Sequence, residues 1–207
     1  LRAQHEGSRF ESDVFLAEQG VLPLKVVRAA HVLTTRVEPE VWVPPRPGDL
    51  VYRARGRDRE LALHFDRMEE KLAAGFSRDG LPVYLDLSFL DGRRGAHVNI
   101  SGVSGVATKT SYASFLLYGL FGSGVLGAEA ANTKALVFNV KGEDLLFLDH
   151  ANARLTEADR LRYDELGLTP GPFGSVGIWA PVRRGGGNPV PDTGSRQQGV
   201  RSYFWTV

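Results

Sequence analysis

Short apolar segments separated by turn-forming residues characterise the first quarter of the chain. They lie at residues 14–16, 24–27, 31–33, 41–43 and 50–52. Their spacing of about eight to twelve residues is typical of a small β-barrel or sandwich. The proline- and glycine-containing run at residues 44–49 fits a turn between two such strands. The pattern therefore predicts a β-rich domain over residues 1–56.

The pattern changes to helical spacing after this block. Large apolar side chains recur among charged ones between residues 57 and 74, at Leu61, Leu63, Phe65, Met68 and Leu72, and Gly75 follows. Apolar positions three to four residues apart place one apolar stripe on a helix. We predict an amphipathic helix over residues 57–74, within a linker that spans residues 57–80.

Alternating strands and helices are expected in the rest of the chain, residues 81–207. The hydrophobic pattern predicts strands at 83–89, 95–100, 134–140 and 176–180, and helices at 109–121 and 144–166. The run at 134–140 is continuously apolar, as in a strand buried on both faces of a parallel sheet. An alternating order of strands and helices favours an α/β fold.

Composition and charge narrow the functional classes. The 207 residues include no cysteine, which excludes a disulfide scaffold and any cysteine-ligated metal site. No uncharged apolar run approaches the roughly 18 residues of a membrane span, so we expect a cytoplasmic protein. With 25 basic and 24 acidic side chains, any nucleic-acid contact must come from a local basic surface.

The methionine count adds an expectation about length. Met68 is the one methionine of the chain, so the sequence does not begin at a start codon. We expect the working protein to be longer than these 207 residues.

The most informative segment is the loop between the strand predicted at 95–100 and the helix predicted at 109–121. A strand, a glycine-containing loop and a Lys-Thr pair at a helix start form the context of a phosphate-binding loop. Backbone N–H groups and the positive helix end converge there on phosphate oxygens. Lys109 would neutralise phosphate charge, and Thr110 would offer its hydroxyl to Mg²⁺.

The match to the usual phosphate-loop pattern is imperfect. The pattern G-x-x-x-x-G-K-[ST] needs glycine at positions 103 and 108, where this chain has Val103 and Thr108. Glycines stand instead at Gly102 and Gly105. Spacing alone leaves a second interpretation open, in which the glycines shape a turn and Lys109 lies on a solvated helix face.

A family resemblance bears on this choice. Residues 102–111 read GVSGVATKTS and resemble the phosphate loop of HerA-type ATPases, hexameric DNA translocases of the FtsK–HerA group. The β-rich block with Pro44-Pro45 and Pro47-Gly48-Asp49 resembles the small barrel that precedes their motor domain. Residues 137–143 resemble their strand followed by a Gly-Glu motif, although Asn139 stands where many members have Asp. Residues 191–196 and 203–205 are also similar to that family.

The resemblance implies a fold and a site. The fold is a β-barrel assembly domain at 1–56 followed by the front part of a RecA-like P-loop α/β core at 81–207. It implies Lys109 and Glu143 as catalytic residues and Thr110 as a Mg²⁺ ligand. The implied ATP-binding residues are Gly102, Ser104, Gly105, Val106, Ala107, Thr108, Lys109, Thr110 and Ser111.

The resemblance also implies an activity and partners. The activity is ATP hydrolysis that drives translocation or unwinding of double-stranded DNA through a ring, expected to be a homo-hexamer. The expected effector is a NurA-like nuclease or a phage-defence enzyme. No membrane partner is expected.

One part of such a motor is not evident in the sequence. A RecA-type motor needs a Walker B strand that ends in acidic residues. The single local candidate is the apolar run 145–148 followed by Asp149, but it directly follows Gly142-Glu143-Asp144, and a short helix explains the same residues. We favour the helix and expect the Walker B strand beyond Val207.

Several single residues could have either a functional or a purely structural role. Glu143 would orient the attacking water, or it is a solvated acid at a helix N-terminus. Arg93 and Arg94 would reach a nucleotide, or they belong to a solvated turn. His97 is expected to be a hydrogen-bonded core residue, and the histidines show no metal-ligand spacing.

Two alternative functions remain beside the motor. The first is a ring-forming scaffold or regulatory subunit with a degenerate nucleotide site. The lack of glycine before Lys109 favours this alternative, whereas the intact Lys109-Thr110 pair opposes it. The second, a P-loop kinase or GTPase, is disfavoured by the leading β-rich block and the lack of a guanine-reading motif.

Overall fold

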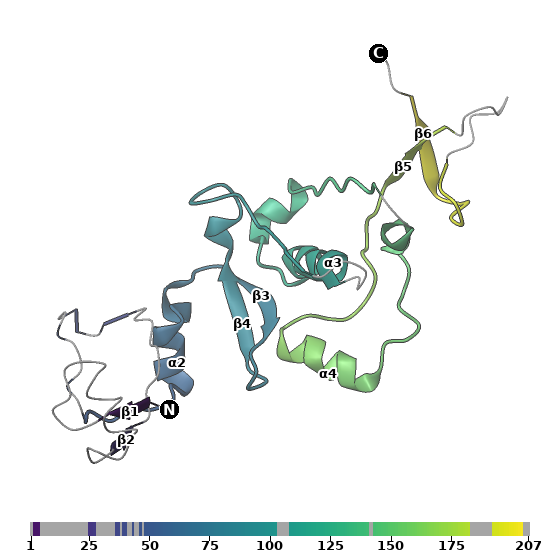
Figure 1. Cartoon of the computed structure of the whole chain (residues 1–207). Helices are drawn as coiled ribbons and strands as arrows, with labels where there is room; N and C mark the ends of the chain where they lie inside the picture. Colours follow the sequence, from purple (N-terminus) through teal and green to yellow (C-terminus); the bar gives the residue numbers. More distant parts are fainter. Residues whose placement is uncertain are drawn as a thin grey trace. The chain divides into compact units, whose positions relative to one another are not determined.

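A computed structural model describes the chain in two compact units, Leu1–Asp66 and Arg67–Val207. Figure 1 shows the elements of both units along the chain. The described residues are 2–4, 25–27, 36–37, 39–40, 43, 46, 48–102, 108–140, 143–182 and 192–204.

The first unit contains one small sheet among its described residues. Strand β1 (Arg2–Gln4) pairs antiparallel with β2 (Lys25–Val27), with Ala3 opposite Val26. This confirms the strand predicted at 24–27, whereas β1 was not predicted. The strands predicted at 14–16 and 31–33, and most of 41–43, lie outside the described residues. The β-barrel stays a prediction.

The strand predicted at 50–52 is wrong. These residues are irregular, and Leu50, Val51 and Tyr52 are 78%, 90% and 79% exposed. A strand is stable only when its backbone groups pair with a neighbour. The apolar side chains of residues 50–52 suggested a strand, but they do not show whether a neighbouring strand is present to pair with it.

The helix predicted over residues 57–74 is correct only in its first part. Helix α2 (Gly56–Ala62) ends before His64, which adopts a left-handed φ of 58°. A short 3-10 helix (Phe65–Arg67) follows, and β3 (Lys71–Phe76) then replaces the predicted helix. The left-handed backbone cannot continue a right-handed helix, so Phe65 is buried in the 3-10 helix and Leu72 on β3 instead.

A β-hairpin opens the second unit. Strand β3 pairs antiparallel with β4 (Pro82–Asp86), with Leu72 opposite Leu85. The register shifts between Ala73 and Gly75, where Gly75 has a φ of 124°. This bulge needs glycine because other residues rarely adopt such a φ. The strand predicted at 83–89 is confirmed up to Asp86, and a 3-10 helix (Leu87–Phe89) forms its remainder.

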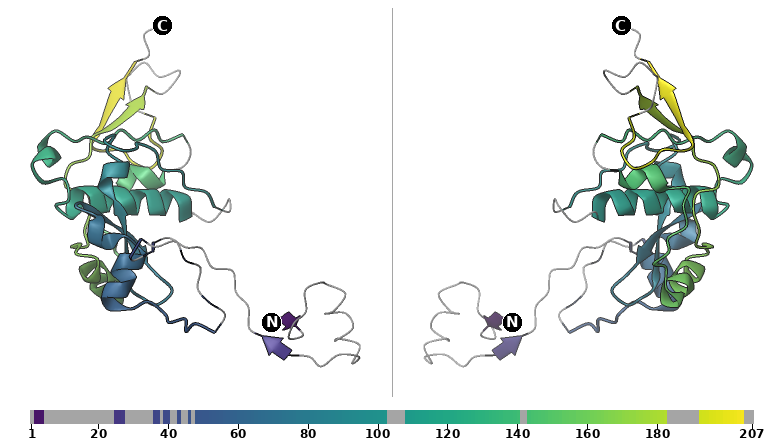
Figure 2. Two further views of the ribbon diagram at one scale, coloured as in Figure 1. Left: turned by 90° about the vertical axis from the view of Figure 1, so that its left-hand side faces the viewer. Right: turned by 90° about the vertical axis from the view of Figure 1, so that its right-hand side faces the viewer.

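Helix α3 (Thr108–Gly122) confirms the helix predicted at 109–121 and packs against β3 (Figure 2). The close approach occurs at Gly119, which is buried. A Cβ there would lie 3.4 Å from Leu72 Cδ1 and 4.0 Å from Leu168 Cδ1. The small residue therefore lets the helix backbone lie close to the hairpin.

The core of the second unit lies between this helix, the hairpin and α4 (Glu157–Glu165). Leu168 is 1% exposed, and Ala73 and Leu166 are also buried. The partly buried aromatic side chains that surround them are Phe76, Tyr84, Phe115 and Tyr163. Thr156 caps the N-terminus of α4: its hydroxyl accepts from the Asp159 backbone N–H, and the Asp159 carboxylate accepts from the Thr156 backbone N–H.

The helix predicted over 144–166 is interrupted. A 3-10 helix, η4 (Asp144–Phe147), is separated from α4 by irregular chain. Residues 145–147 of the apolar run are therefore helical, as we favoured, Leu148 follows in a turn, and the run is not a strand. A further 3-10 helix (Gly127–Ala131) follows α3.

Two predicted strands are wrong. Residues 95–100 and 134–140 are irregular, and Leu136, Phe138 and Val140 are 81%, 79% and 95% exposed. Strand β5 (Ile178–Pro181) confirms the strand predicted at 176–180 in most of its length and pairs in parallel with β6 (Val200–Tyr203). The described residues thus form three two-stranded sheets, and the RecA-like core stays a prediction.

Candidate functional site

The start of α3 carries the basic residue of the proposed phosphate loop. Lys109 is the second residue of the helix and is half-buried. Its Nζ donates a hydrogen bond of 3.0 Å to the carbonyl oxygen of Gly102. The ammonium group therefore lies next to the residue at which the loop begins. The two ends of the candidate loop are brought together.

The first turn of α3 has the chemistry of an anion site. It contains Lys109 and the exposed residues Thr110 and Ser111, and no carboxylate. A helix N-terminus with N–H groups, hydroxyl groups and a cation favours phosphate oxygens. Thr110 could also provide one hydroxyl ligand to Mg²⁺. A protein-bound Mg²⁺ ion usually has few protein ligands, and water molecules and phosphate oxygens fill its other positions. Gly102 is exposed, Thr108 begins the helix, and Ser104, Gly105, Val106 and Ala107 lie outside the described residues.

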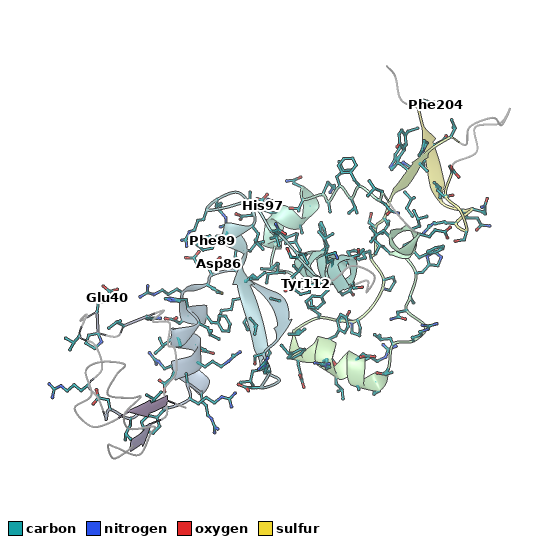
Figure 3. The ribbon with its side chains drawn as sticks, in the orientation of Figure 1. Glu40, Asp86, Phe89, His97, Tyr112 and Phe204 are labelled. Carbon is teal, nitrogen blue, oxygen red and sulfur yellow. The ribbon has the colours of Figure 1, made fainter. Side chains whose placement is uncertain are left out.

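A cavity of about 270 Å³ opens beside the second turn of the same helix. Its lining includes Tyr112, Phe115 and Phe76, and the Arg162 guanidinium lies 5.0 Å from the centre of the Phe76 ring. The Tyr112 hydroxyl, labelled in Figure 3, donates to the Ala74 carbonyl oxygen at 3.0 Å. The lining also includes the Asp159 carboxylate, whereas the first turn of α3 combines a lysine and hydroxyl groups with no carboxylate, so the phosphate chemistry belongs to the helix start.

Glu143, the candidate catalytic carboxylate, is exposed and directly precedes η4. Its Oε1 accepts a hydrogen bond of 3.2 Å from the Ser195 backbone N–H, and its Oε2 accepts one from the Ser195 hydroxyl. Its side chain does not cap η4. The contacts described for Glu143 and for Lys109 therefore involve different parts of the chain.

A buried arginine joins the same two segments. Arg196 is 8% exposed, and its Nη2 donates to Asp149 Oδ2 at 2.7 Å. Its Nη1 donates to Asp149 Oδ1 and to the Leu146 carbonyl oxygen. The hydrogen bonds from Arg196, together with one from His150, hold the pKa of Asp149 well below its usual range. The same pairing with Asp149 raises the pKa of Arg196.

Sequence reasoning did not assign a role to Ser195 or Arg196. It treated residues 191–196 only as part of a resemblance. The available signal was the run Thr193-Gly194-Ser195-Arg196, in which a glycine stands between two hydroxyl residues before a basic one. Such a run is typical of a tight turn. Its contact with Glu143, 52 positions away, could not be predicted.

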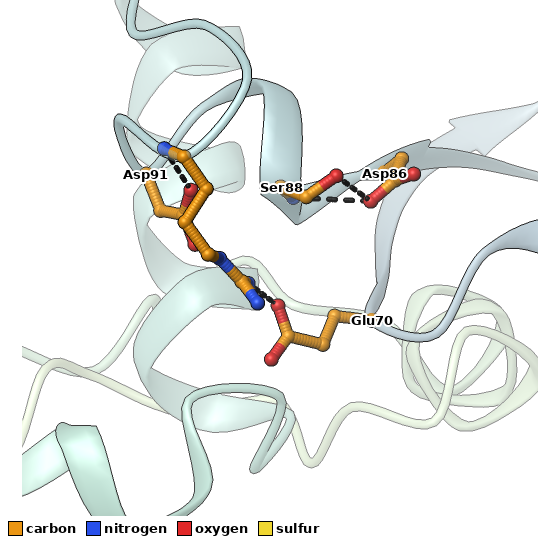
Figure 4. Close-up of polar contacts among 5 residues, drawn as sticks. Glu70, Asp86, Ser88 and Asp91 are labelled. Carbon is orange, nitrogen blue, oxygen red and sulfur yellow. Dashed lines mark hydrogen bonds and ion pairs between the residues drawn. The ribbon is translucent and has the colours of Figure 1, made fainter.

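Arg93 and Arg94 lie after β4, and both guanidinium groups contact side chains of the second unit. The Arg93 guanidinium pairs with the carboxylates of Asp91 and Glu70, which are labelled in Figure 4, and these contacts raise the pKa of Arg93. The backbone N–H of Arg93 donates to Asp91 Oδ1 at 2.9 Å. This hydrogen bond is the main reason that the pKa of Asp91 is lowered. The Arg94 guanidinium lies 5.7 Å from the centre of the Phe89 ring. These contacts favour the solvated-turn interpretation.

His97 does not lie in the core, contrary to the prediction. Its side chain is exposed (Figure 3), because residues 95–100 form no strand that would bury it. Over the part of the chain that the structure describes, no three His, Asp or Glu side chains are grouped to hold a metal ion. None of the described helices is long and apolar enough to cross a membrane.

Comparisons with known proteins add no assignment. A scan against protein-family models and a search of curated proteins each gave no match to this chain. The HerA resemblance therefore rests on the residues quoted above.

Proposed function

We propose that the protein binds Mg-ATP at residues 102–111 and hydrolyses it as part of a HerA-type ring motor. The observation that carries the proposal is the hydrogen bond from Lys109 Nζ to the Gly102 carbonyl oxygen, at the start of α3. It joins the first and last parts of the sequence GVSGVATKTS around one helix N-terminus. The lysine, hydroxyl groups and helix end in that turn favour a polyphosphate ligand.

Each residue has a distinct role in this proposal. Lys109 exchanges its carbonyl partner for phosphate oxygens and neutralises their charge, and Thr110 contributes a hydroxyl to Mg²⁺. Mg²⁺ supplies further charge neutralisation of the phosphate groups when it is bound. Glu143 accepts a hydrogen bond from the attacking water and orients it. The remaining loop residues provide backbone N–H donors.

The partners in this proposal follow from the resemblance. The working assembly is a homo-hexamer that moves or unwinds double-stranded DNA together with a nuclease or a phage-defence effector. The near-neutral charge, a net +1, means that DNA contacts come from local arginines of the assembled ring. Fold does not fix function, so the DNA activity needs its own assay.

Hydrolysis assays test the proposal. ATP turnover is measured with and without double-stranded DNA for the wild type, Lys109→Ala and Lys134→Ala. Lys134 is the matched control because it is exposed and its Nζ donates to the Ala131 carbonyl oxygen, three residues away. We expect turnover that DNA stimulates in the wild type and the control, and that Lys109→Ala abolishes. Equal, DNA-independent background rates in all three proteins would refute the motor.

A scaffold function is the second candidate, because Thr108 replaces the glycine that usually precedes the phosphate-loop lysine. A larger residue there limits the close approach of a phosphate to the backbone. This alternative predicts a ring by native mass spectrometry, an effector that co-purifies with it, and no change in either for Lys109→Ala. Loss of ATP turnover in Lys109→Ala would exclude it.

A further inference from the structure

Two segments that are far apart in the sequence meet at Arg196. Its guanidinium donates to both carboxylate oxygens of Asp149 and to the Leu146 carbonyl oxygen, while its Nε donates to the Gln198 carbonyl oxygen at 3.0 Å. The guanidinium also lies 5.9 Å from the centre of the Phe147 ring. Bidentate pairing of arginine with a carboxylate fixes direction as well as distance. Arg196 therefore holds residues 192–198 against η4 and the residues that follow it.

The turn that precedes this guanidinium has its own hydrogen bonds. Thr193 is 6% exposed, and its hydroxyl donates to the Arg196 carbonyl oxygen. The Arg196 backbone N–H donates to the Thr193 carbonyl oxygen at 3.2 Å. Residues 193–196 thus form a closed turn, which we call the 193–196 turn. Both of its ends are fixed.

The 193–196 turn presents two donors to one carboxylate. The backbone N–H of Ser195 donates to Glu143 Oε1, and its hydroxyl donates to Glu143 Oε2. A carboxylate has about four acceptor positions, so two remain for a further donor such as water. The Glu143 side chain is therefore held in one orientation, and its carboxylate can still accept further hydrogen bonds.

Gly194 allows the carboxylate to come this close. Its φ is 58°, a left-handed conformation that side chains disfavour. A Cβ at this position would overlap Glu143 Oε1 and lie 2.8 Å from Glu143 Cδ. Any residue larger than glycine would therefore displace the carboxylate. Both the left-handed backbone conformation and the lack of space for a side chain therefore require glycine at position 194.

We propose that the 193–196 turn is a positioning element for Glu143, with Ser195 as the positioning residue and the Arg196–Asp149 pair as its support. The inference rests on the proposed function, in which Glu143 orients the attacking water. An exposed glutamate samples several rotamers, and fixing one of them removes an ordering cost from the transition state. Ser195 acts through Glu143 and does not itself contact the nucleotide in this proposal.

The test compares kcat and KM for Mg-ATP in the wild type and four variants of the protein. Ser195→Ala removes the hydroxyl donor, Ser195→Thr restores it, and Gly194→Ala displaces the carboxylate. Ser175→Ala is the matched control because Ser175 is exposed and lies outside this turn. We expect Ser195→Ala to lower kcat about tenfold or more with KM changed less than about twofold, since a hydrogen bond to a charged group is lost. Ser195→Thr should recover most of kcat, and Gly194→Ala should resemble Ser195→Ala.

A double variant tests whether Ser195 acts through Glu143. If it does, Glu143→Gln combined with Ser195→Ala has the same kcat as Glu143→Gln alone, because the two residues work as one unit. Amide hydrogen exchange checks the contact itself: the Ser195 N–H should exchange faster in Glu143→Ala than in the wild type.

Different outcomes overturn different claims. Wild-type kcat in Ser195→Ala, a loss confined to KM, or additive losses in the double variant would refute the positioning role while leaving ATP hydrolysis intact. Unchanged Ser195 exchange in Glu143→Ala would refute the contact. A wild type that hydrolyses ATP no faster than Lys109→Ala would instead overturn the proposed function, and the positioning role with it.

Discussion

Replacing Leu168 with alanine tests the core that holds α3 in place. Leu168 is 1% exposed and packs with Ala73 and Leu166, and its Cδ1 lies near the backbone of α3 at Gly119. Removing a fully buried leucine side chain loses its transfer free energy and leaves a cavity. Because this site is enclosed by a strand and two helices, we expect a loss of about 3 kcal/mol in unfolding free energy.

Leu161→Ala is the matched control, because Leu161 lies on α4 and is 57% exposed. Urea unfolding followed by circular dichroism gives the midpoint and slope for each protein. With a slope of roughly 2 kcal/mol per molar urea, Leu168→Ala should lower the midpoint by about 1.5 M, and Leu161→Ala should leave it nearly unchanged. Equal midpoints for the two variants would refute the described core.

Two further predictions follow from single contacts. Gly119→Ala should stabilise the protein by up to about 1 kcal/mol, because alanine favours a helix and its Cβ would only touch Leu72 Cδ1, at 3.4 Å. Gly119→Leu should destabilise the protein in the same urea assay, because the larger side chain would overpack this contact. The lowered Asp149 pKa means that the pair with Arg196 stabilises the fold above the ordinary carboxyl pKa of 3.8 and loses this effect as pH falls below it. The difference in melting temperature between wild type and Asp149→Asn should therefore be largest near neutral pH and shrink in acid; a constant difference would contradict the assignment.

Local signals in the sequence predicted the helices and strands that depend on near neighbours. Helix α3 has helix-forming residues and ends at Gly122, and β4 and β5 have short apolar runs. The predicted strands at 95–100 and 134–140 failed because a strand needs a partner, and apolar residues such as Phe138 do not specify one. The helix expected through residue 74 failed at the left-handed His64, which no periodicity indicates.

The candidate site was predictable only where it is local. Lys109 and Thr110 could be placed at a helix start because the glycines, the lysine and the hydroxyl residue stand close together in the sequence. The contact of Ser195 with Glu143 joins residues 52 positions apart. It depends on a buried arginine and a positive-φ glycine, neither of which has a periodic signature. Spacing arguments are unable to find such a contact.

Equilibrium binding of Mg-ATP tests the central claim most directly. Isothermal titration calorimetry is applied to the wild type, Lys109→Ala and the control Lys134→Ala. Loss of a charge-assisted hydrogen bond to phosphate predicts a Kd about 10 to 100 times weaker in Lys109→Ala, with the control equal to the wild type. The same affinity in all three proteins, or no binding to the wild type, would contradict a nucleotide site at the start of α3.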